Sequence, residues 1–441
     1  MQTTPAPRSG YILALLTLAY VLSLLDRSIL PLLIQPLQRD LHISDTQFAV
    51  LHGVAFAVFY AAAILPIGWM ADRYSRKKIM ATGVALWSAM TAFSGLARSY
   101  NHLFLARMGV GIGEAALQPA AYSLITDLFP KERLARAIAI FSTGGVFGQG
   151  AAFIIAGAVM TMLGNREAVM LPLVGETRLW QATFLFLGIP GLVLAAMIVM
   201  IREPARQHRP PTAAANLAEL KAFIVRRRAL LAPLCMANAL IVFVTVAFMV
   251  WVPAMLMRNH GLAMGEVGVV MGLAQGIGFG FGYVSGGWLT DRWFSRGHSD
   301  AHVRVGIIGA LAALPLVLVA TLVGSTEAAM VAVCFICFFA GFPVPAAIAG
   351  LQLVTAPGHR AVITSGYMLV ANLVATALGP LSVAFLTDDV FGRPTAVNLS
   401  LCLVGVVVLP VTALLYALAR RPFMLAIDQM RADAALARTH H

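Results

Sequence analysis

Charged residues are scarce in this sequence: they make up only 11% of its 441 residues, whereas 60% are hydrophobic. A soluble domain carries roughly 25% charged residues. A water-soluble fold could not bury so much apolar side chain. The composition therefore excludes a soluble globular protein and indicates a membrane protein.

Cysteine and closely spaced histidine are scarce as well. The four cysteines fall inside predicted membrane helices, where neither a disulfide framework nor a zinc ribbon is expected. The spacing of Cys334 and Cys337 is interpreted as apolar packing. Of the ten histidines, no two are spaced as metal ligands within one helix. We predict no metal site, no catalytic residues, no cofactor and no enzyme activity.

Long apolar runs are what the sequence has in abundance. A membrane-spanning helix needs about 20 mostly apolar residues, and about twelve such runs follow one another with short connections. We predict an all-α integral membrane fold with about twelve transmembrane helices. The runs lie at roughly 11–35, 46–70, 80–98, 103–126, 137–163, 180–201, 231–257, 265–289, 305–324, 327–352, 361–386 and 396–419.

A short repeat underlies these runs. The segment GWMADR at 68–73 recurs as GWLTDR at 287–292, with four of six positions identical. An offset of about half the chain predicts two six-helix bundles related by a parallel repeat. The predicted parts are an N-terminal bundle at 1–201, a cytoplasmic linker at 202–230, a C-terminal bundle at 231–420 and a cytoplasmic tail at 421–441.

The net charge of +12 is spread over alternate loops, and this distribution predicts orientation. If the N-terminus is cytoplasmic, the loops on its side hold most of the basic residues, including the run at 226–228. The positive-inside rule then places both termini and the linker in the cytoplasm. The bilayer, and not nucleic acid, is the predicted partner of this charge. The alanine- and arginine-rich composition suggests a bacterial inner membrane.

The first repeat copy carries a recognisable motif. The segment 68–78 reads G-x-x-A-D-R-x-x-R-K-K and resembles the cytoplasmic signature loop of the major facilitator superfamily. The resemblance implies a cytoplasmic gate in which Asp72 accepts hydrogen bonds at a helix N-terminus near Thr364 and Ser365, while arginines pair with nearby acids. The predicted gate residues are Gly68, Asp72, Arg73, Arg76, Asp127, Asp291 and Arg292.

Two further segments resemble the spinster branch of this superfamily. They are LLDR at 24–27 and RMGVGIGEA at 107–115, the latter followed by QPAAYSLITDLFP at 118–130. The likeness continues near Trp180, although Gln181 stands where the branch usually has arginine. The resemblance implies a carrier that works by alternating access, and spinster-like carriers are associated with lysophospholipids and sphingolipid phosphates.

Ionisable residues inside a membrane are costly and usually functional. Asp26 and Arg27 lie in the first predicted helix and Arg107 and Glu114 in the fourth. Arg107 and Glu114 are two helical turns apart, about 10 Å, on one helix face. We predict proton coupling by Asp26 and Glu114 and substrate binding by Arg27 and Arg107. A static Asp26–Arg27 pair is the alternative.

The second half has no strongly predicted charge at mid-membrane depth. Its polar candidates are Asn238, Gln275, Gln352 and Asn372, of which we predict that Asn238 and Asn372 bind substrate. One charged and one apolar half suit an anionic amphiphile such as a lysophospholipid. A small organic anion, such as an aromatic or sugar acid, is the alternative substrate.

The predicted function is that of a proton-coupled transporter, acting as a monomer. A channel is disfavoured because no ring of selectivity residues is visible. A substrate sensor built on the same fold stays open at this stage. Glycines at small-x-x-x-small spacing in the fifth and eighth predicted helices indicate close helix packing.

Overall fold

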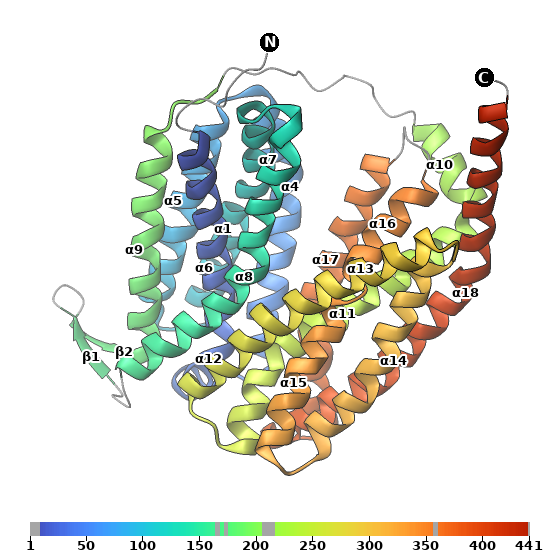
Figure 1. Ribbon diagram of the computed structural model, residues 1–441. Helices are drawn as coiled ribbons and strands as arrows, with labels where there is room; N and C mark the ends of the chain where they lie inside the picture. The colour runs from blue at the N-terminus through green and yellow to red at the C-terminus, as the bar shows by residue number, and fades with distance from the viewer. Residues whose placement is uncertain (1–8, 164–167, 172–174, 205–216, 356–359, 440–441) are drawn as a thin grey trace. The chain divides into compact units, whose positions relative to one another are not determined.

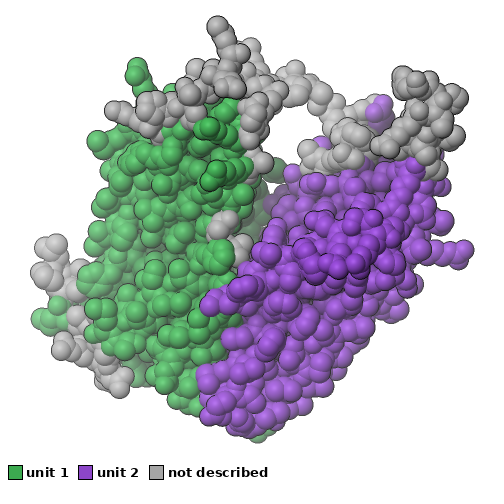
Figure 2. Space-filling model, in the orientation of Figure 1, with its two compact units in different colours: residues 1–211, 253–276, 388–394 green, residues 212–252, 277–387, 395–441 purple. Residues whose placement is uncertain are grey.

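The computed structural model describes residues 9–163, 168–171, 175–204, 217–355 and 360–439. These residues are almost all helical, with one two-stranded antiparallel hairpin (Figure 1). The chain forms two compact units (Figure 2). Unit 1 comprises 1–211, 253–276 and 388–394, and unit 2 comprises 212–252, 277–387 and 395–441.

The predicted all-helical membrane fold is confirmed. Among the described residues, 10 helical stretches are long and apolar enough to cross a membrane. The third and fourth predicted helices are not among these stretches. Helix α5 (Arg76–Ser94) begins with three basic residues, and a break at Ala115 and Ala116 divides the fourth into α6 (Tyr100–Glu114) and α7 (Leu117–Leu128).

Unit 1 is built mainly from the first half of the chain. Its core joins side chains of α1 and of α4 to α9, which run side by side (Figure 1). Part of α11 and a short segment near residue 390 complete it. Besides α5, α6 and α7, its elements are α1 (Ser9–Leu32), α2 (Ile34–Leu41), α3 (Asp45–Ala49), the π-helical turn η1 (Val50–Val54), α4 (Ala55–Arg73), α8 (Lys131–Leu163), β1 (Ala168–Leu171), β2 (Gly175–Arg178), α9 (Leu179–Met200) and α12 (Met264–Leu273).

Unit 2 holds most of the second half. Helix α10 forms within the predicted linker, and η2 and η4 run across the unit boundaries. The elements are α10 (Leu217–Arg226), α11 (Arg228–His260), η2 (Ala274–Phe279), α13 (Gly280–Ser295), α14 (Ala301–Leu322), α15 (Thr326–Gly341), α16 (Val344–Val354), α17 (Arg360–Phe385), η4 (Leu386–Val390), η5 (Pro394–Ala396) and α18 (Val397–Thr439).

The last helix is longer than the apolar run predicts. Helix α18 continues through the predicted tail to Thr439. The extension contacts the turn before α14: the Arg420 Nε atom lies 2.7 Å from Asp300 Oδ2, and Arg431 donates to the Gly297 carbonyl oxygen. Polar contacts therefore stabilise a helical segment that hydropathy could not reveal.

Glycines bring α8 and α12 into close contact within unit 1. A Cβ atom added to Gly268 would lie 2.7 Å from Gly157 Cα and 2.8 Å from the Phe153 carbonyl oxygen. At Gly150, an added Cβ would lie 2.5 Å from Gly276 Cα. The two backbones approach this closely only because side chains are absent, as the glycine spacing predicts.

We expect Gly268→Val to destabilise the protein by about 1–3 kcal/mol, because the added carbons would meet backbone atoms that cannot move aside. The midpoint of thermal unfolding in detergent would measure this loss. Gly366→Val on α17 is the matched control, because nothing lies within 4 Å of a Cβ atom at Gly366. Equal midpoints for the two variants would contradict the packing argument.

Candidate functional site

The four predicted charged residues meet in unit 1. We call Asp26 and Arg27 on α1 and Arg107 and Glu114 on α6 the charged quartet. Arg27 Nε donates to Glu114 Oε2 at 2.7 Å, and Arg107 Nη1 donates to Asp26 Oδ2 at 3.2 Å. Asp26, Arg107 and Glu114 are 4%, 1% and 2% exposed. Two ion pairs thus link α1 to α6, while the roles of the four residues remain predictions.

The two carboxylates are not equally satisfied. Asp26 Oδ1 accepts a hydrogen bond from the Thr91 hydroxyl at 2.8 Å, so both of its oxygens are bonded. Glu114 Oε2 accepts from Ser23 as well as from Arg27, but Glu114 Oε1 has no hydrogen-bond partner among the described residues. Arg107 Nε is also buried without a hydrogen-bond partner among the described residues. Glu114 therefore keeps an oxygen with which it could bind a proton or a ligand.

Aromatic rings from α4 cover the arginines. The Arg27 guanidinium carbon lies 4.3 Å from the Phe56 ring centroid and 5.5 Å from that of Tyr60. The Arg107 guanidinium carbon lies 5.7 Å from the Phe56 centroid. Such contacts stabilise a cation where water is scarce. Neither aromatic residue is among the predicted site residues, although their four-residue spacing, which places them on one helix face, is visible in the sequence.

A glycine on α6 permits this cover. A Cβ atom added to Gly111 would lie 2.6 Å from the Phe56 carbonyl oxygen. Any side chain there would push α4 away and move Phe56 off the arginines. The glycine-rich run around Glu114 therefore shapes the site as well as the helix packing.

Part of the predicted gate also assembles in unit 1. Arg76 is 1% exposed and pairs with the Asp127 carboxylate. It binds Glu203 through its backbone N–H at 2.9 Å and through Nε at 3.1 Å, and its Nη1 donates to the Ser123 carbonyl oxygen at 3.2 Å. Glu203 lies 127 residues from Arg76 along the chain, and no local motif in the sequence marks it as a partner.

Glu203 lies just beyond the end of α9, outside the apolar span. Burial raises the pKa of its carboxyl, but hydrogen bonds from the Ser75 hydroxyl and from Arg76 outweigh burial and hold the pKa below its usual range. Ser75 and Arg76, at the start of α5, therefore favour the charged form of Glu203.

The other predicted gate residues are placed differently. Arg73 lies over the Trp69 ring at 3.8 Å, and Arg292 lies over the Trp288 ring at 5.1 Å, so the two repeat copies share one local arrangement. Gly68 faces open space, and Asp291 is exposed. The side chain of Asp72 lies outside the part that the structure describes, and its predicted hydrogen bonds stay a prediction.

The two asparagines predicted to bind substrate differ in their surroundings. Asn238 is buried in unit 2, and its Oδ1 accepts from the Tyr416 hydroxyl at 2.5 Å. Asn372 is exposed, and its Nδ2 donates to the Met368 carbonyl oxygen of its own helix. The structure describes no contact between the two side chains.

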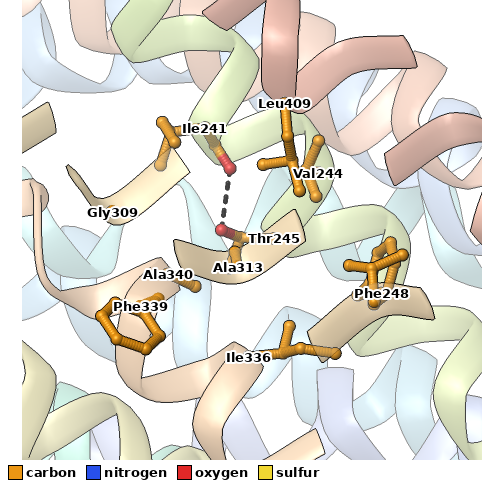
Figure 3. Close-up of a pocket in the computed structure, with 11 residues that line it drawn as sticks. Ile241, Val244, Thr245, Phe248, Gly309, Ala313, Ile336, Phe339, Ala340 and Leu409 are labelled. Atoms are coloured by element: carbon orange, nitrogen blue, oxygen red, sulfur yellow. Dashed lines mark hydrogen bonds between the residues drawn. The ribbon is translucent and has the colours of Figure 1, made fainter. Parts of the chain in front are cut away.

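Unit 2 encloses an apolar pocket between α11, α14, α15 and α18 (Figure 3). The hydroxyl of Thr245 points to the Ile241 carbonyl oxygen, to which it donates at 2.8 Å. Every other side chain that lines the pocket is apolar. The lining therefore favours apolar over charged groups. Its lining is Ile241, Val244, Thr245, Phe248, Gly309, Ala313, Val317, Ile336, Phe339, Ala340 and Leu409.

A further buried ion pair in unit 1 joins the end of α11 to α2 and α3. Arg258 donates to both oxygens of Asp45, at 2.6 and 2.7 Å, and to Gln38 Oε1 at 2.7 Å. The side chains of Arg258 and Asp45 are 8% and 1% exposed. This bidentate pair ties a segment of the second half of the chain to the first half.

We expect Arg258→Gln to lower stability by about 3–5 kcal/mol, because the Asp45 carboxylate would stay buried without its countercharge. The double variant Arg258→Gln, Asp45→Asn is expected to regain much of this loss, since it removes both charges. Thermal unfolding of both single variants and the double variant in detergent gives the coupling energy. Strictly additive losses would show that the pair is not coupled.

Within the described ranges, no group of three or more His, Cys, Asp or Glu side chains could hold a metal ion. The arrangement of unit 1 instead offers two arginines for an anion and a buried carboxylate with one unbonded oxygen.

The whole chain is similar to known membrane transporters. Residues 16–380 match the sequence profile of the Major Facilitator Superfamily. An MFS-type efflux pump of Mycolicibacterium smegmatis is 28% identical, over 87% of this chain and 85% of that protein. A probable L-galactonate transporter of Escherichia coli is 25% identical, over 64% of this chain and 61% of that protein.

Among solved structures, the chain is similar to a bacterial homolog of the human lysosomal transporter Spinster, crystallised in an inward-facing and unoccupied conformation. The TM-score is 0.80 at 25% identity, and the match covers 98% of this chain and 99% of that chain.

Proposed function

The chain belongs to the Major Facilitator Superfamily, in its spinster-like branch, and we propose that it is a proton-coupled secondary transporter that works by alternating access. The observation that carries the proposal is the pairing of Glu114 with Arg27. A buried carboxylate bonded to a partly exposed arginine at membrane depth is the combination that lets a proton and an anion influence each other's binding.

The coupling follows from the contacts of the charged quartet. Arg27 is the most accessible of the four, because 33% of its side chain is exposed. An anion that binds Arg27 draws the guanidinium away from Glu114 and leaves that carboxylate without its countercharge. A buried carboxylate without a countercharge favours binding a proton. Anion and proton therefore bind together, and both leave when the pair reforms.

We propose an anionic amphiphile, such as a lysophospholipid, as the substrate. Planar guanidinium groups suit phosphate oxygens, and the charged quartet supplies two of them. The apolar pocket of unit 2 supports a substrate that also carries hydrocarbon. Each unit by itself thus offers one of the two chemistries that an amphiphile requires.

A small organic anion is the second candidate substrate. It is supported by the similarity to a protein named as a probable L-galactonate transporter. A sugar acid would use the arginines in the same way, through its carboxylate, but would not need an apolar pocket.

We further propose that the protein lies in a bacterial inner membrane as a monomer, with both termini in the cytoplasm. The distribution of arginine and lysine between alternate loops supports this orientation.

Flux into proteoliposomes tests the proposal. The purified protein would be reconstituted. Uptake of a labelled lysophosphatidylglycerol and of labelled D-galactonate would be measured with and without a proton gradient directed into the liposomes. We expect saturable lysolipid uptake that the gradient accelerates. Uptake of galactonate alone would favour the second candidate, and no gradient effect on either compound would refute proton coupling.

A further inference from the structure

His52 is a buried polar residue that neither the gate nor the ion pairs use. It is 5% exposed, and its Nδ1 atom has no hydrogen-bond partner among the described residues. It lies in η1, a single π-helical turn between α3 and α4. Single π-helical turns inside helices are frequent at functional sites. A buried polar atom without a partner costs about 1–3 kcal/mol, so its position calls for an explanation.

The position of His52 points to the charged quartet. His52, Phe56 and Tyr60 follow one another at four-residue intervals. The Phe56 ring lies over both Arg27 and Arg107, and the Tyr60 ring lies over Arg27. The His52 imidazole is also within electrostatic reach of both guanidinium groups. The Phe48 ring is stacked with the imidazole, with the ring centroids 6.3 Å apart. His52 is therefore the polar end of an aromatic face that covers the arginines.

Three buried polar atoms around this site lack partners among the described residues: His52 Nδ1, Arg107 Nε and Glu114 Oε1. Arg107 Nε can only donate a hydrogen bond, and an ionised Glu114 can only accept one. A neutral imidazole nitrogen does either, according to its tautomer. A ligand group that both donates and accepts is the one that fits such a set, and a hydroxyl group does both.

We propose that His52 is a substrate-binding residue whose Nδ1 hydrogen-bonds a hydroxyl group next to the anionic group of the substrate. This inference rests on the proposed function and narrows its substrate class to hydroxylated anions. A lysophospholipid with a free glycerol hydroxyl and a sugar acid with a hydroxyl beside its carboxylate share this chemistry.

The test compares matched substrates with and without the hydroxyl group. Proteoliposomes would be given oleoyl-lysophosphatidic acid or its deoxy analogue, and D-galactonate or 2-deoxy-D-galactonate. We expect the wild-type protein to prefer the hydroxylated member of the transported pair by about 10-fold in Vmax/KM, the effect of one buried hydrogen bond. If the lysophosphatidic acid pair is transported, the anionic group of the substrate is a lipid phosphate. If the galactonate pair is transported, it is the carboxylate of a sugar acid.

Three variants then assign the preference to Nδ1. His52→Phe keeps a ring of similar shape without polar atoms, and we expect it to lower Vmax/KM for the hydroxylated compound by about 10-fold and so to lose the preference. His52→Asn places an amide near the Nδ1 position and should keep the preference. His52→Gln places its amide near the Nε2 position and should lose it. Asn and Gln therefore form a matched pair if the Phe variant fails to fold.

The outcomes separate the two proposals. An unchanged preference in His52→Phe and His52→Gln, or no preference in the wild-type protein, would overturn the role of His52 and leave anion transport standing. If the wild-type protein transports no member of either pair, the proposed function fails and the inference fails with it. A fall of the unfolding midpoint in His52→Phe without ligand, together with an unchanged preference, would show a purely structural role.

Discussion

Glu114→Gln is expected to reduce uptake driven by a pH gradient by at least about 100-fold, which is the scale on which a positioned proton-transfer group acts. Glutamine can still accept hydrogen bonds from Arg27 and Ser23, but it cannot exchange a proton with water. Substrate exchange without a gradient should therefore survive, because exchange needs no net proton movement. Uptake and exchange measured in the same proteoliposomes would separate the two effects.

Ser23→Ala is the matched control for this prediction. It removes a hydrogen bond to the same carboxylate oxygen, Glu114 Oε2, and changes no charge. We expect gradient-driven uptake to fall only slightly in this variant. If Glu114→Gln kept the gradient-driven uptake of the wild-type protein, the coupling proton would have to bind another residue. Asp26→Asn would then be the next variant to test.

Arg76→Gln is expected to destabilise the protein by about 3–5 kcal/mol, because two carboxylates would lose a buried counterion. Arg76 binds Asp127, Glu203, Ser123 and the Pro204 carbonyl oxygen. The midpoint of thermal unfolding in detergent measures the loss. Arg73→Gln, three residues earlier, is the control: this arginine is exposed, and its contact with Trp69 is worth about 0.5–1 kcal/mol. Equal losses in both variants would contradict the structural role of Arg76.

The contacts of Arg76 with Glu203 also predict that the stability of the protein depends on pH. The pKa of Glu203 is lowered in the folded protein, so its contribution is fully present above its unfolded-state pKa and is lost as pH falls through the folded value. We expect the unfolding midpoint of the wild-type protein to fall in acid more than that of Glu203→Gln. Parallel acid profiles for the two proteins would exclude this contribution.

The sequence predicted the fold class and four charged residues of the site, because hydropathy and the cost of a charge in a membrane are properties of single residues and short runs. It did not predict which acid each arginine binds. Because Asp26 and Arg27 are adjacent, a static pair between them was the alternative prediction. In the structure Asp26 instead binds Arg107 and Arg27 binds Glu114, both on α6. Neighbouring residues on a helix point about 100° apart, so they do not face each other.

The partners that lie far along the chain could not be predicted. Phe56 is one of 24 phenylalanines, and only its approach to Arg27 distinguishes it. In the sequence, Glu203 looks like an ordinary charged loop residue. Only the packing of α9 against α5 brings it to Arg76. The helical extension of α18 depends on contacts with Asp300 and Gly297 and not on apolar run length.

The sequence by itself determined that this protein lies in a membrane, consists of helices, repeats a motif in its two halves and carries costly charges in its first and fourth apolar runs. Only the tertiary structure decided which acid each arginine binds, which aromatic rings cover the arginines and which buried polar atoms are left without a partner. Hydropathy is summed along the chain, whereas a hydrogen bond or an ion pair depends on the distance between two atoms, and packing alone sets that distance.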